Sequence, residues 1–148
     1  MARGDPGAGA FVEIPPVWRG PVPADEEWTA PYWDAIRRHE LSVQRCVRCV
    51  SWHHPPVLVC PHCSSDDLEF VAVAGTGTVY ASTVCHREFG LQIGVPWVAA
   101  YVELDEGARL ATNLVNCSSE GMPIGASVRV VYQDYPDLEL TLAFFEPA

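Results

Sequence analysis

Two Cys-x-x-Cys pairs separated by ten residues constrain this chain more than any other feature of its sequence. The pairs are Cys46 with Cys49 and Cys60 with Cys63. Each pair can form a tight turn, a knuckle, that brings two sulfur atoms to one side, and two knuckles complete a tetrahedron of four thiolates. The short linker suits a rubredoxin-like ribbon. We therefore predict one metal ion bound by the four cysteines, zinc by preference, with iron in the same geometry as the minor alternative.

A site with four thiolate ligands has no open coordination position, which indicates a structural rather than a catalytic metal. Metal binding contributes on the order of 10 kcal/mol to folding in zinc-finger peptides, and a ribbon over 41–67 with few apolar residues would depend on it. Glycine often follows the second cysteine of a knuckle, whereas Val50 and Ser64 stand there in this chain, so the knuckle geometry is open. A redox-active thiol pair would require a βαβ context that this sequence lacks.

The remaining histidines and cysteines predict no second site. We expect exposed loop positions, and no role as ligands, for the three histidines near the metal loop, His53, His54 and His62. Cys85 and Cys117 fall in predicted strands and are expected to be small buried side chains. Adjacent strand residues point to opposite faces, so His86 cannot readily pair with Cys85. The sequence contains no serine-centred nucleophile elbow and no histidine–carboxylate metal motif, and we predict no catalytic residue.

From Leu68 onward the sequence changes to a period of two, which is typical of β-strands. The segments are rich in Val, Thr, Tyr and Phe and are separated by short turns. They cover residues 69–74, 78–88, 95–104, 109–117, 127–134 and 138–145. Five or six short strands at this spacing predict a small closed barrel or sandwich over 68–148, and closure is favoured because it removes exposed strand edges.

The residues before the ribbon divide into an arm and a short helix. Residues 1–28 are rich in proline and glycine, which predicts a flexible arm, although apolar residues such as Trp18 leave open an arm that orders on a partner. Residues 29–40 are predicted to be helical, because Pro31 suits a first turn and basic residues lie late in the segment. The aromatic residues of this helix, Trp33 among them, are expected to pack on the body of the protein, with a partner-binding face as the alternative.

The charge of the chain excludes several classes of function. The 148 residues include nine Arg and no Lys, and the formal net charge is −10. This charge argues against non-specific binding to nucleic acid or anionic lipid, which require a basic surface, and the missing lysine excludes Schiff-base chemistry within this chain. No signal peptide is visible and no apolar run is long enough to span a membrane, so we expect a cytoplasmic protein whose cysteines bind metal instead of forming disulfides.

The order of the motifs resembles a known family. The motifs are PYWDAI at 31–36, LSVQRC at 41–46, CPHC at 60–63, GTGTVY at 75–80, VELDEG at 102–107 and TNLV at 112–115. Over 30–146 the chain is similar to small bacterial and archaeal proteins in which a rubredoxin-like zinc ribbon is followed by an OB fold, and which are associated with acyl-CoA metabolism. The resemblance implies a mainly β protein with an N-terminal helix, a four-cysteine ribbon at 41–67 and an OB-fold barrel at 68–148.

The resemblance also implies an accessory role. Family members sit with a thiolase-superfamily protein that acts on acyl-CoA thioesters, and in some assemblies a lipid-transfer-protein-like aldolase subunit shortens steroid side chains. The metal ligands carry over onto the four cysteines, whereas no catalytic residue carries over. We therefore expect the non-catalytic subunit of a hetero-oligomer that forms or cleaves carbon–carbon bonds at a CoA thioester, with retro-aldol cleavage of a steroid side-chain CoA thioester as one setting.

Candidate contacts to CoA or to the partner lie near the ribbon in sequence. They are Arg37, Arg38, Arg45, Arg48 and Trp33. The phosphates of CoA require cations, although a solvated basic strip is the plainer interpretation of these arginines. Two other functions stay open: a nucleic-acid-binding ribbon/OB module, against which the charge counts, and a rubredoxin-like electron carrier, which would require iron.

Overall fold

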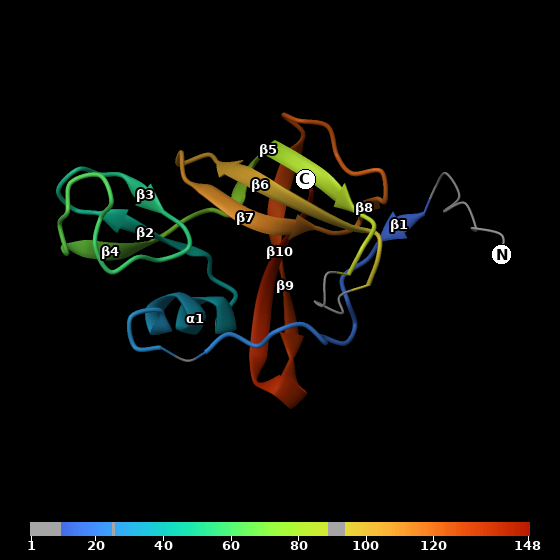
Figure 1. Ribbon diagram of the computed structural model, residues 1–148, viewed down its shortest axis with the longest axis horizontal. Helices are drawn as coiled ribbons and strands as arrows, with labels where there is room; N and C mark the ends of the chain where they lie inside the picture. The colour runs from blue at the N-terminus through green and yellow to red at the C-terminus, as the bar shows by residue number, and fades with distance from the viewer. Residues whose placement is uncertain (1–9, 25, 89–93) are drawn as a thin grey trace.

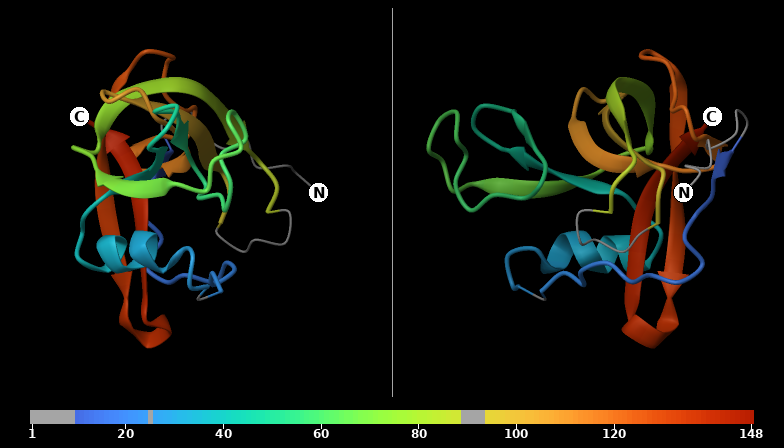
Figure 2. Two further views of the ribbon diagram at one scale, coloured as in Figure 1. Left: turned by 90° about the vertical axis from the view of Figure 1, so that its left-hand side faces the viewer. Right: turned by 45° about the vertical axis from the view of Figure 1, so that its right-hand side comes forward.

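The computed structural model describes residues 10–24, 26–88 and 94–148. A three-stranded ribbon lies beside a closed five-stranded barrel, and helix α1 (Ala30–Arg37) lies below the ribbon in Figure 1. Figure 2 shows the same units from two further directions. The predicted fold class, mainly β with one helix, a four-cysteine ribbon and a small barrel, is confirmed. No helix in the described part of the chain is long and apolar enough to cross a membrane.

The ribbon is an antiparallel sheet with strand β2 in its centre. Its strands are β2 (Ser42–Cys46), β3 (Trp52–His53) and β4 (Leu68–Ala72), in the order β3–β2–β4. The buried amide of Gln44 donates to the carbonyl of Val57 (3.0 Å) and accepts from the Val57 N–H (2.7 Å). This pair of bonds holds the loop that follows β3 against the sheet and satisfies a buried polar side chain.

Strand β4 is the segment that we expected at 69–74, within the barrel domain. In the structure it pairs with β2 instead, from Ala72 opposite Ser42 to Leu68 opposite Cys46. Strand β2 is buried along most of its length, so it requires a neighbour on each edge, and the two-residue β3 covers only part of one edge. A period of two predicts that a segment is a strand but does not specify which sheet it joins.

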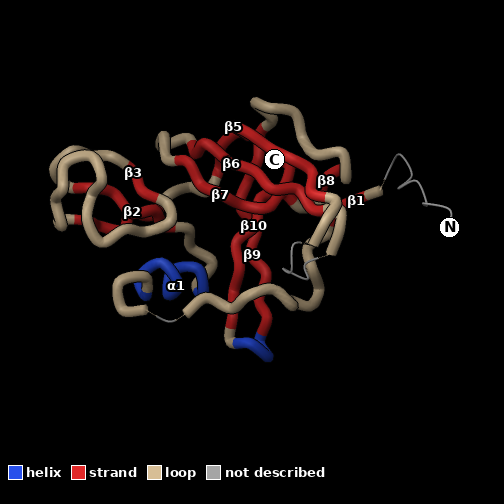
Figure 3. The backbone as a smooth tube through the Cα atoms, viewed as in Figure 1, coloured by secondary structure: helices blue, strands red, loops and turns tan. Residues whose placement is uncertain are grey.

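The barrel is formed by five longer strands. They are β5 (Thr76–Cys85), β6 (Trp97–Leu104), β7 (Arg109–Leu114), β9 (Ser127–Tyr135) and β10 (Leu140–Pro147), closed in the order β10–β7–β6–β5–β9. Closure is made by the parallel pairing of β10 with β7, where Phe145 lies opposite Leu114. Alternate residues of β6, Val98, Ala100, Val102 and Leu104, face inward and are buried. In Figure 3 the strands are red, and the blue turn between β9 and β10 is η1 (Pro136–Leu138).

Helix α1 connects the two units. Its Ile36 is fully buried and belongs to the same apolar cluster as Val43 of the ribbon and Val79 of the barrel. Beyond the helix, the imidazole of His39 donates a hydrogen bond to the Asp134 carboxylate (3.0 Å) and stacks on the ring of Tyr132 (5.0 Å between centroids). The helix is therefore fixed to β9 at its C-terminal end.

The described part of the N-terminal arm lies along the barrel, which differs from the flexible arm expected over 1–28. Strand β1 (Phe11–Val12) pairs with β8 (Cys117–Ser118), and the Tyr135 hydroxyl donates to the Pro15 carbonyl (2.6 Å). The ring of Trp18 lies against Tyr135 and Phe144. Prolines hold the backbone extended before it docks, which lowers the entropic cost of ordering it. Residues 1–9 of the expected arm lie outside the described residues.

Candidate metal centre

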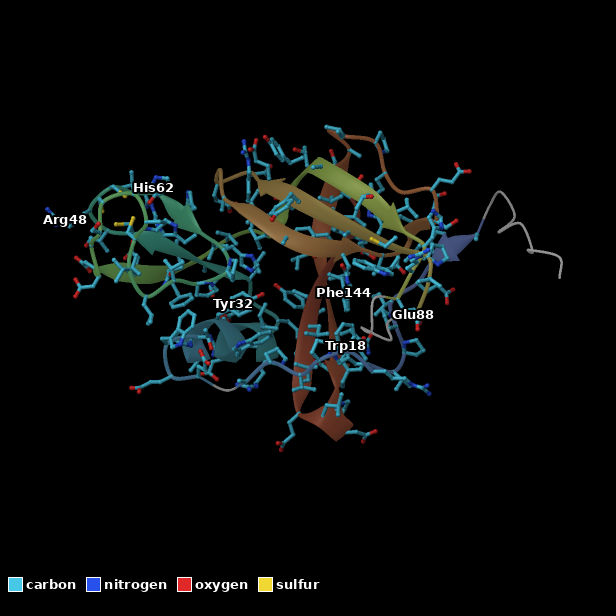
Figure 4. All side chains as sticks on the ribbon, viewed as in Figure 1. Trp18, Tyr32, Arg48, His62, Glu88 and Phe144 are labelled. Atoms are coloured by element: carbon cyan, nitrogen blue, oxygen red, sulfur yellow. The ribbon has the colours of Figure 1, made fainter. Side chains whose placement is uncertain are left out.

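The two knuckles bring four sulfur atoms together in the ribbon. All four Sγ atoms lie within 4.8 Å of one another, and Figure 4 shows sulfur, in yellow, between the labelled Arg48 and His62. Cys46 Sγ is 3.6 Å from Cys63 Sγ, and Cys49 Sγ is 3.5 Å from Cys60 Sγ. A tetrahedral zinc ion with Zn–S bonds of about 2.3 Å places its sulfurs about 3.8 Å apart. The observed spacing therefore fits one tetrahedral ion.

Both knuckles form without the glycine that is usual after the second cysteine. The N–H of Val50 donates to the Cys46 carbonyl (3.0 Å), and the N–H of Ser64 donates to the Cys60 carbonyl (2.8 Å). Val50 and Ser64 have φ angles of 56° and 59°, in the left-handed region that disfavours L side chains. The ribbon therefore keeps the turn geometry at the cost of backbone strain at two positions.

A serine and a histidine support the sulfur cluster, and sequence reasoning missed both. The Ser51 hydroxyl lies 3.0 Å from Cys49 Sγ, 3.5 Å from Cys60 Sγ and 3.0 Å from Nε2 of His53. With its proton on Nε2, His53 donates to Ser51 and leaves the hydroxyl proton for a thiolate. His53 is buried, so the expectation of an exposed loop residue is wrong for it. The available signal was a Ser-x-His sequence directly after the first knuckle, whose two side chains share one strand face.

Hydrogen bonds and burial shift the pKa values of the clustered cysteine thiols in different directions. Burial raises the pKa of Cys60, but hydrogen bonds from the Ser51 hydroxyl and the Cys63 backbone outweigh it and lower the pKa to about 5. The Ser51 hydrogen bonds also lower the pKa of Cys49. A hydrogen bond from the Ser65 backbone favours the Cys63 thiolate, yet burial and the neighbouring sulfurs raise the Cys63 pKa to about 12. Four thiolates therefore require a cation among them, as a divalent metal provides.

The other histidines and cysteines lie apart from the cluster. His62 is exposed as expected, whereas His54 is half-buried and its pKa is lowered to about 4 by burial. Cys117 is buried as expected, and Cys85 is half-buried. In residues 10–24, 26–88 and 94–148, the four cysteines are the only group of three or more metal-ligating side chains that converge.

Four of the five candidate CoA or partner contacts are engaged in separate local interactions. Arg37 pairs with Asp34 (2.9 Å) and Arg38 pairs with Glu40 (3.2 Å), all exposed. The other two arginines form no ion pair among the described residues: Arg45 lies over the Trp52 ring, and Arg48 is exposed at the outer end of the ribbon. Trp33 packs edge-on against Tyr32. Two of the four arginines are thus already neutralised by carboxylates of this chain.

Two family models match adjoining segments of the chain. The model described as the ChsH2 rubredoxin-like zinc ribbon domain matches residues 33–69, and the ChsH2 C-terminal OB-fold domain matches residues 70–133. A solved structure described as "Ltp2-ChsH2(DUF35) aldolase" is 40% identical, with 85% of this chain and 98% of that chain covered and a TM-score of 0.73. A DUF35-family protein from Sulfolobus solfataricus, 15% identical over 82% of this chain and 86% of that chain, has the same fold with a TM-score of 0.57.

Curated relatives carry two kinds of name. A "probable enoyl-CoA hydratase alpha subunit" from Thermomonospora curvata is 41% identical over 86% of this chain and 40% of its own length. A "3-oxo-4,17-pregnadiene-20-carboxyl-CoA hydratase alpha subunit" from Mycobacterium tuberculosis is 36% identical over 80% and 38%. The chain therefore spans about two fifths of the length of these two relatives. A "DUF35 domain-containing scaffold protein" from Methanocaldococcus jannaschii is 34% identical over 68% of this chain and 74% of its own length.

Proposed function

Because this chain belongs to the DUF35 family of ChsH2-type proteins, in which a rubredoxin-like zinc ribbon precedes an OB-fold domain, we propose that it is a metal-stabilised accessory subunit of an acyl-CoA enzyme complex. The observation that carries the proposal is the closed four-sulfur cluster. Four sulfur ligands would fill the coordination shell of one metal ion. Such an ion would stabilise the ribbon and would have no free coordination position for a substrate. The catalytic groups would then be supplied by another chain.

The partner proposed is a thiolase-superfamily subunit of the lipid-transfer-protein type. Its reaction would form or cleave a carbon–carbon bond at an acyl-CoA thioester, with retro-aldol cleavage of a steroid side-chain CoA thioester as the specific case. Support comes from the name of the 40%-identical structure, which pairs Ltp2 with ChsH2 in an aldolase, and from the pregnadiene-carboxyl-CoA in one relative's name. The hydratase names belong to much longer proteins and support no hydration chemistry in this chain.

Zinc is the proposed resident ion, with Cys46, Cys49, Cys60 and Cys63 as its ligands. When bound, it would cross-link the two knuckles and supply no reaction chemistry. Ser51 would donate its hydroxyl proton to a ligand thiolate, and His53 would hold the Ser51 hydroxyl in that orientation. The spacing between paired sulfurs, 3.5 to 3.6 Å, supports a single tetrahedral ion.

Replacing one ligand tests the metal site. Cys60→Ser removes one of four thiolates, so we expect loss of bound metal and a large fall in melting temperature, because metal binding contributes on the order of 10 kcal/mol to such modules. Cys85→Ser is the matched control, since it removes a half-buried strand thiol outside the cluster. Metal content per chain and thermal unfolding are the measurements. A full equivalent of zinc with unchanged melting in Cys60→Ser would contradict the proposed ligand set.

The accessory role is tested by separating and recombining the chains. Coexpression with a thiolase-superfamily protein of the lipid-transfer type should give a stable hetero-oligomer that cleaves a β-hydroxyacyl-CoA thioester, whereas this chain alone should not. The candidate contacts stay proposals, and Arg48→Ala, at an exposed position with no ion pair among the described residues, is the first variant to examine for weaker assembly. Turnover of a thioester by the isolated chain at an ordinary enzymatic rate would overturn the proposal.

A further inference from the structure

A recess separate from the sulfur cluster lies on the outer face of the barrel. It has a volume of about 630 Å³ and is bordered by the arm and by strands β5, β6, β7 and β10. Its floor consists of cross-strand neighbours that face away from the barrel core: Ala81 and Ala111 flank Tyr101, and Asn113 lies opposite Ala99. We call this recess the barrel groove.

The walls of the barrel groove are held in place by contacts within the chain. One wall is the arm, where the Trp18 indole N–H donates to the Pro21 carbonyl (3.0 Å). The arm packs there on β10, which contributes Leu142 and Phe144 to the lining, and the rings of Trp18 and Phe144 lie 6.5 Å apart. Figure 4 labels both residues close together beside strands β9 and β10. The shape of the groove is therefore set by contacts within the chain.

The lining of the barrel groove is uncharged, although the chain carries a net charge of −10. Among the described residues, none that lines the groove is acidic or basic. Aromatic and alanine side chains dominate, and the polar groups are hydroxyls and one amide, from Ser82, Thr83, Thr112 and Asn113. Tyr101 remains about half exposed. A volume of this size, apolar walls and a few hydroxyl or amide groups are typical of small-molecule sites.

We propose that the barrel groove binds an uncharged apolar small molecule, or the uncharged apolar part of a larger one. Thr83 and Asn113 lie on either side of Ala99 in the floor, and the hydroxyl of the one and the amide of the other each offer a hydrogen bond to a polar group of that ligand. An acidic ligand is disfavoured because the described lining residues include no cation and the chain is strongly acidic. This inference is independent of the proposed partner and goes beyond the proposed accessory role.

Two other occupants fit the barrel groove less well. A peptide cannot add as a strand to the middle of the floor, because the central strand β6 is paired with β5 along one edge and with β7 along the other. A second copy of the chain, related by two-fold symmetry, would place one concave surface against another and leave both unfilled. A compact apolar ligand needs no free strand edge and can fill the concave space.

The test compares two probes that share a ring system and differ in charge. N-phenyl-1-naphthylamine is neutral, whereas 1-anilinonaphthalene-8-sulfonate carries a negative charge. With the full zinc-loaded chain we expect saturable one-to-one binding of the neutral probe and at least tenfold weaker binding of the sulfonate. Ala111→Leu fills the groove and should weaken binding of the neutral probe at least tenfold, whereas Ala72→Leu, at an exposed alanine of the ribbon strand β4, should not.

A charge placed in the floor provides a second variant. Thr83→Arg, at an exposed position, should reverse the preference in favour of the sulfonate, and it decides the question if Ala111→Leu does not fold. Equal affinity for both probes, or unchanged binding in a folded Ala111→Leu, would overturn the proposal. Dimerisation that depends on concentration and disappears in Ala111→Leu would assign the groove to a second copy, and would overturn it as well.

Discussion

Among single residues, His54 is held in an unfavourable environment for its charged form. Its Nδ1 is buried with no hydrogen-bond partner among the described residues, and burial lowers its pKa from 6.5 to about 4. Between these two values the unfolded chain binds more protons than the folded protein. The contribution of His54 to the free energy of unfolding therefore rises with pH through this window. It is fully present above pH 6.5 and is lost as the pH falls toward 4.

The pH dependence of unfolding tests this assignment. Lowering the pH from about 7.5 to about 5.5 should cost the wild-type protein about 1.3 kcal/mol through His54 alone. His54→Phe keeps an aromatic ring beside Tyr32 but removes the titration, so its stability should lack this component. Urea unfolding of both zinc-loaded proteins at the two pH values gives the difference directly. The same pH dependence in both would contradict the assignment.

Backbone strain at Val50 predicts an unusual stabilising substitution. Its side chain is exposed and its φ is 56°, so Val50→Gly relieves strain and loses little packing. Val50→Ala keeps a Cβ and therefore keeps the strain. We expect the glycine variant to be about 1 kcal/mol more stable than the alanine variant in thermal unfolding of the zinc-loaded protein. An alanine variant of equal or greater stability would show that the knuckle is not strained there.

The candidate site could be predicted from sequence only in part. The cysteines are detectable because their short spacing alone brings sulfurs together, whatever the rest of the fold does. Ser51 lies two residues after Cys49 and His53 reaches Ser51 from strand β3, but the contact of Ser51 with Cys60 forms only when the two knuckles come together, and no spacing rule encodes that contact. The proposed ligands could thus be chosen from local sequence, whereas the contacts that surround them depended on tertiary structure.

For the strands, the sequence located the elements better than their partners. The segment expected at 127–134 corresponds to β9 (Ser127–Tyr135), and that at 95–104 contains β6 (Trp97–Leu104). The segment expected at 109–117 is divided into β7 and β8, because Asn116 adopts a left-handed φ of 52° between them. Strand β8 then pairs with the arm, a contact between distant segments that alternation cannot predict.

Gly77 of β5 lies where two strands approach closely. A Cβ at this position would collide with the carbonyl oxygen of Glu103 and with the Cα of Leu104, both backbone atoms of the paired strand β6. Gly77→Ala should therefore destabilise the protein by about 3 kcal/mol in urea unfolding. Gly107→Ala is the comparison, because its Cβ meets no atom and costs only the strain of a positive φ. Equal losses for the two variants would contradict a steric cause.

In the whole molecule, helix α1 contacts both the ribbon and the barrel, and the arm packs on the barrel. The arm was expected to be flexible because composition reports the lack of an internal core and not a docking site elsewhere. Trp18 contacts Tyr135 and Phe144, which are distant from it in sequence, and the hydroxyl of Tyr135 holds Pro15. The arm is therefore a tertiary element even though it has almost no secondary structure.

Removing the Trp18 ring should release the arm. The ring is half-buried, so Trp18→Ala should cost about 2 kcal/mol of local stability and speed tryptic cleavage after Arg19 roughly 30-fold. Trp28→Ala, which removes an exposed indole outside the arm contacts, is the control and should leave this rate unchanged. Limited proteolysis followed by mass spectrometry measures both rates. Equal cleavage of the wild-type and Trp18→Ala proteins would show that Trp18 does not restrain the arm.

The contacts of the arm also fix an order of events during synthesis on the ribosome. Its docking partners Tyr135 and Phe144 lie on β9 and β10, which emerge after every other strand of the barrel. At about 5–20 residues per second, the arm waits several seconds outside the ribosome before those rings exist. The arm is thus translated early but is among the last segments to dock. During that delay its indole and prolines are accessible to chaperones.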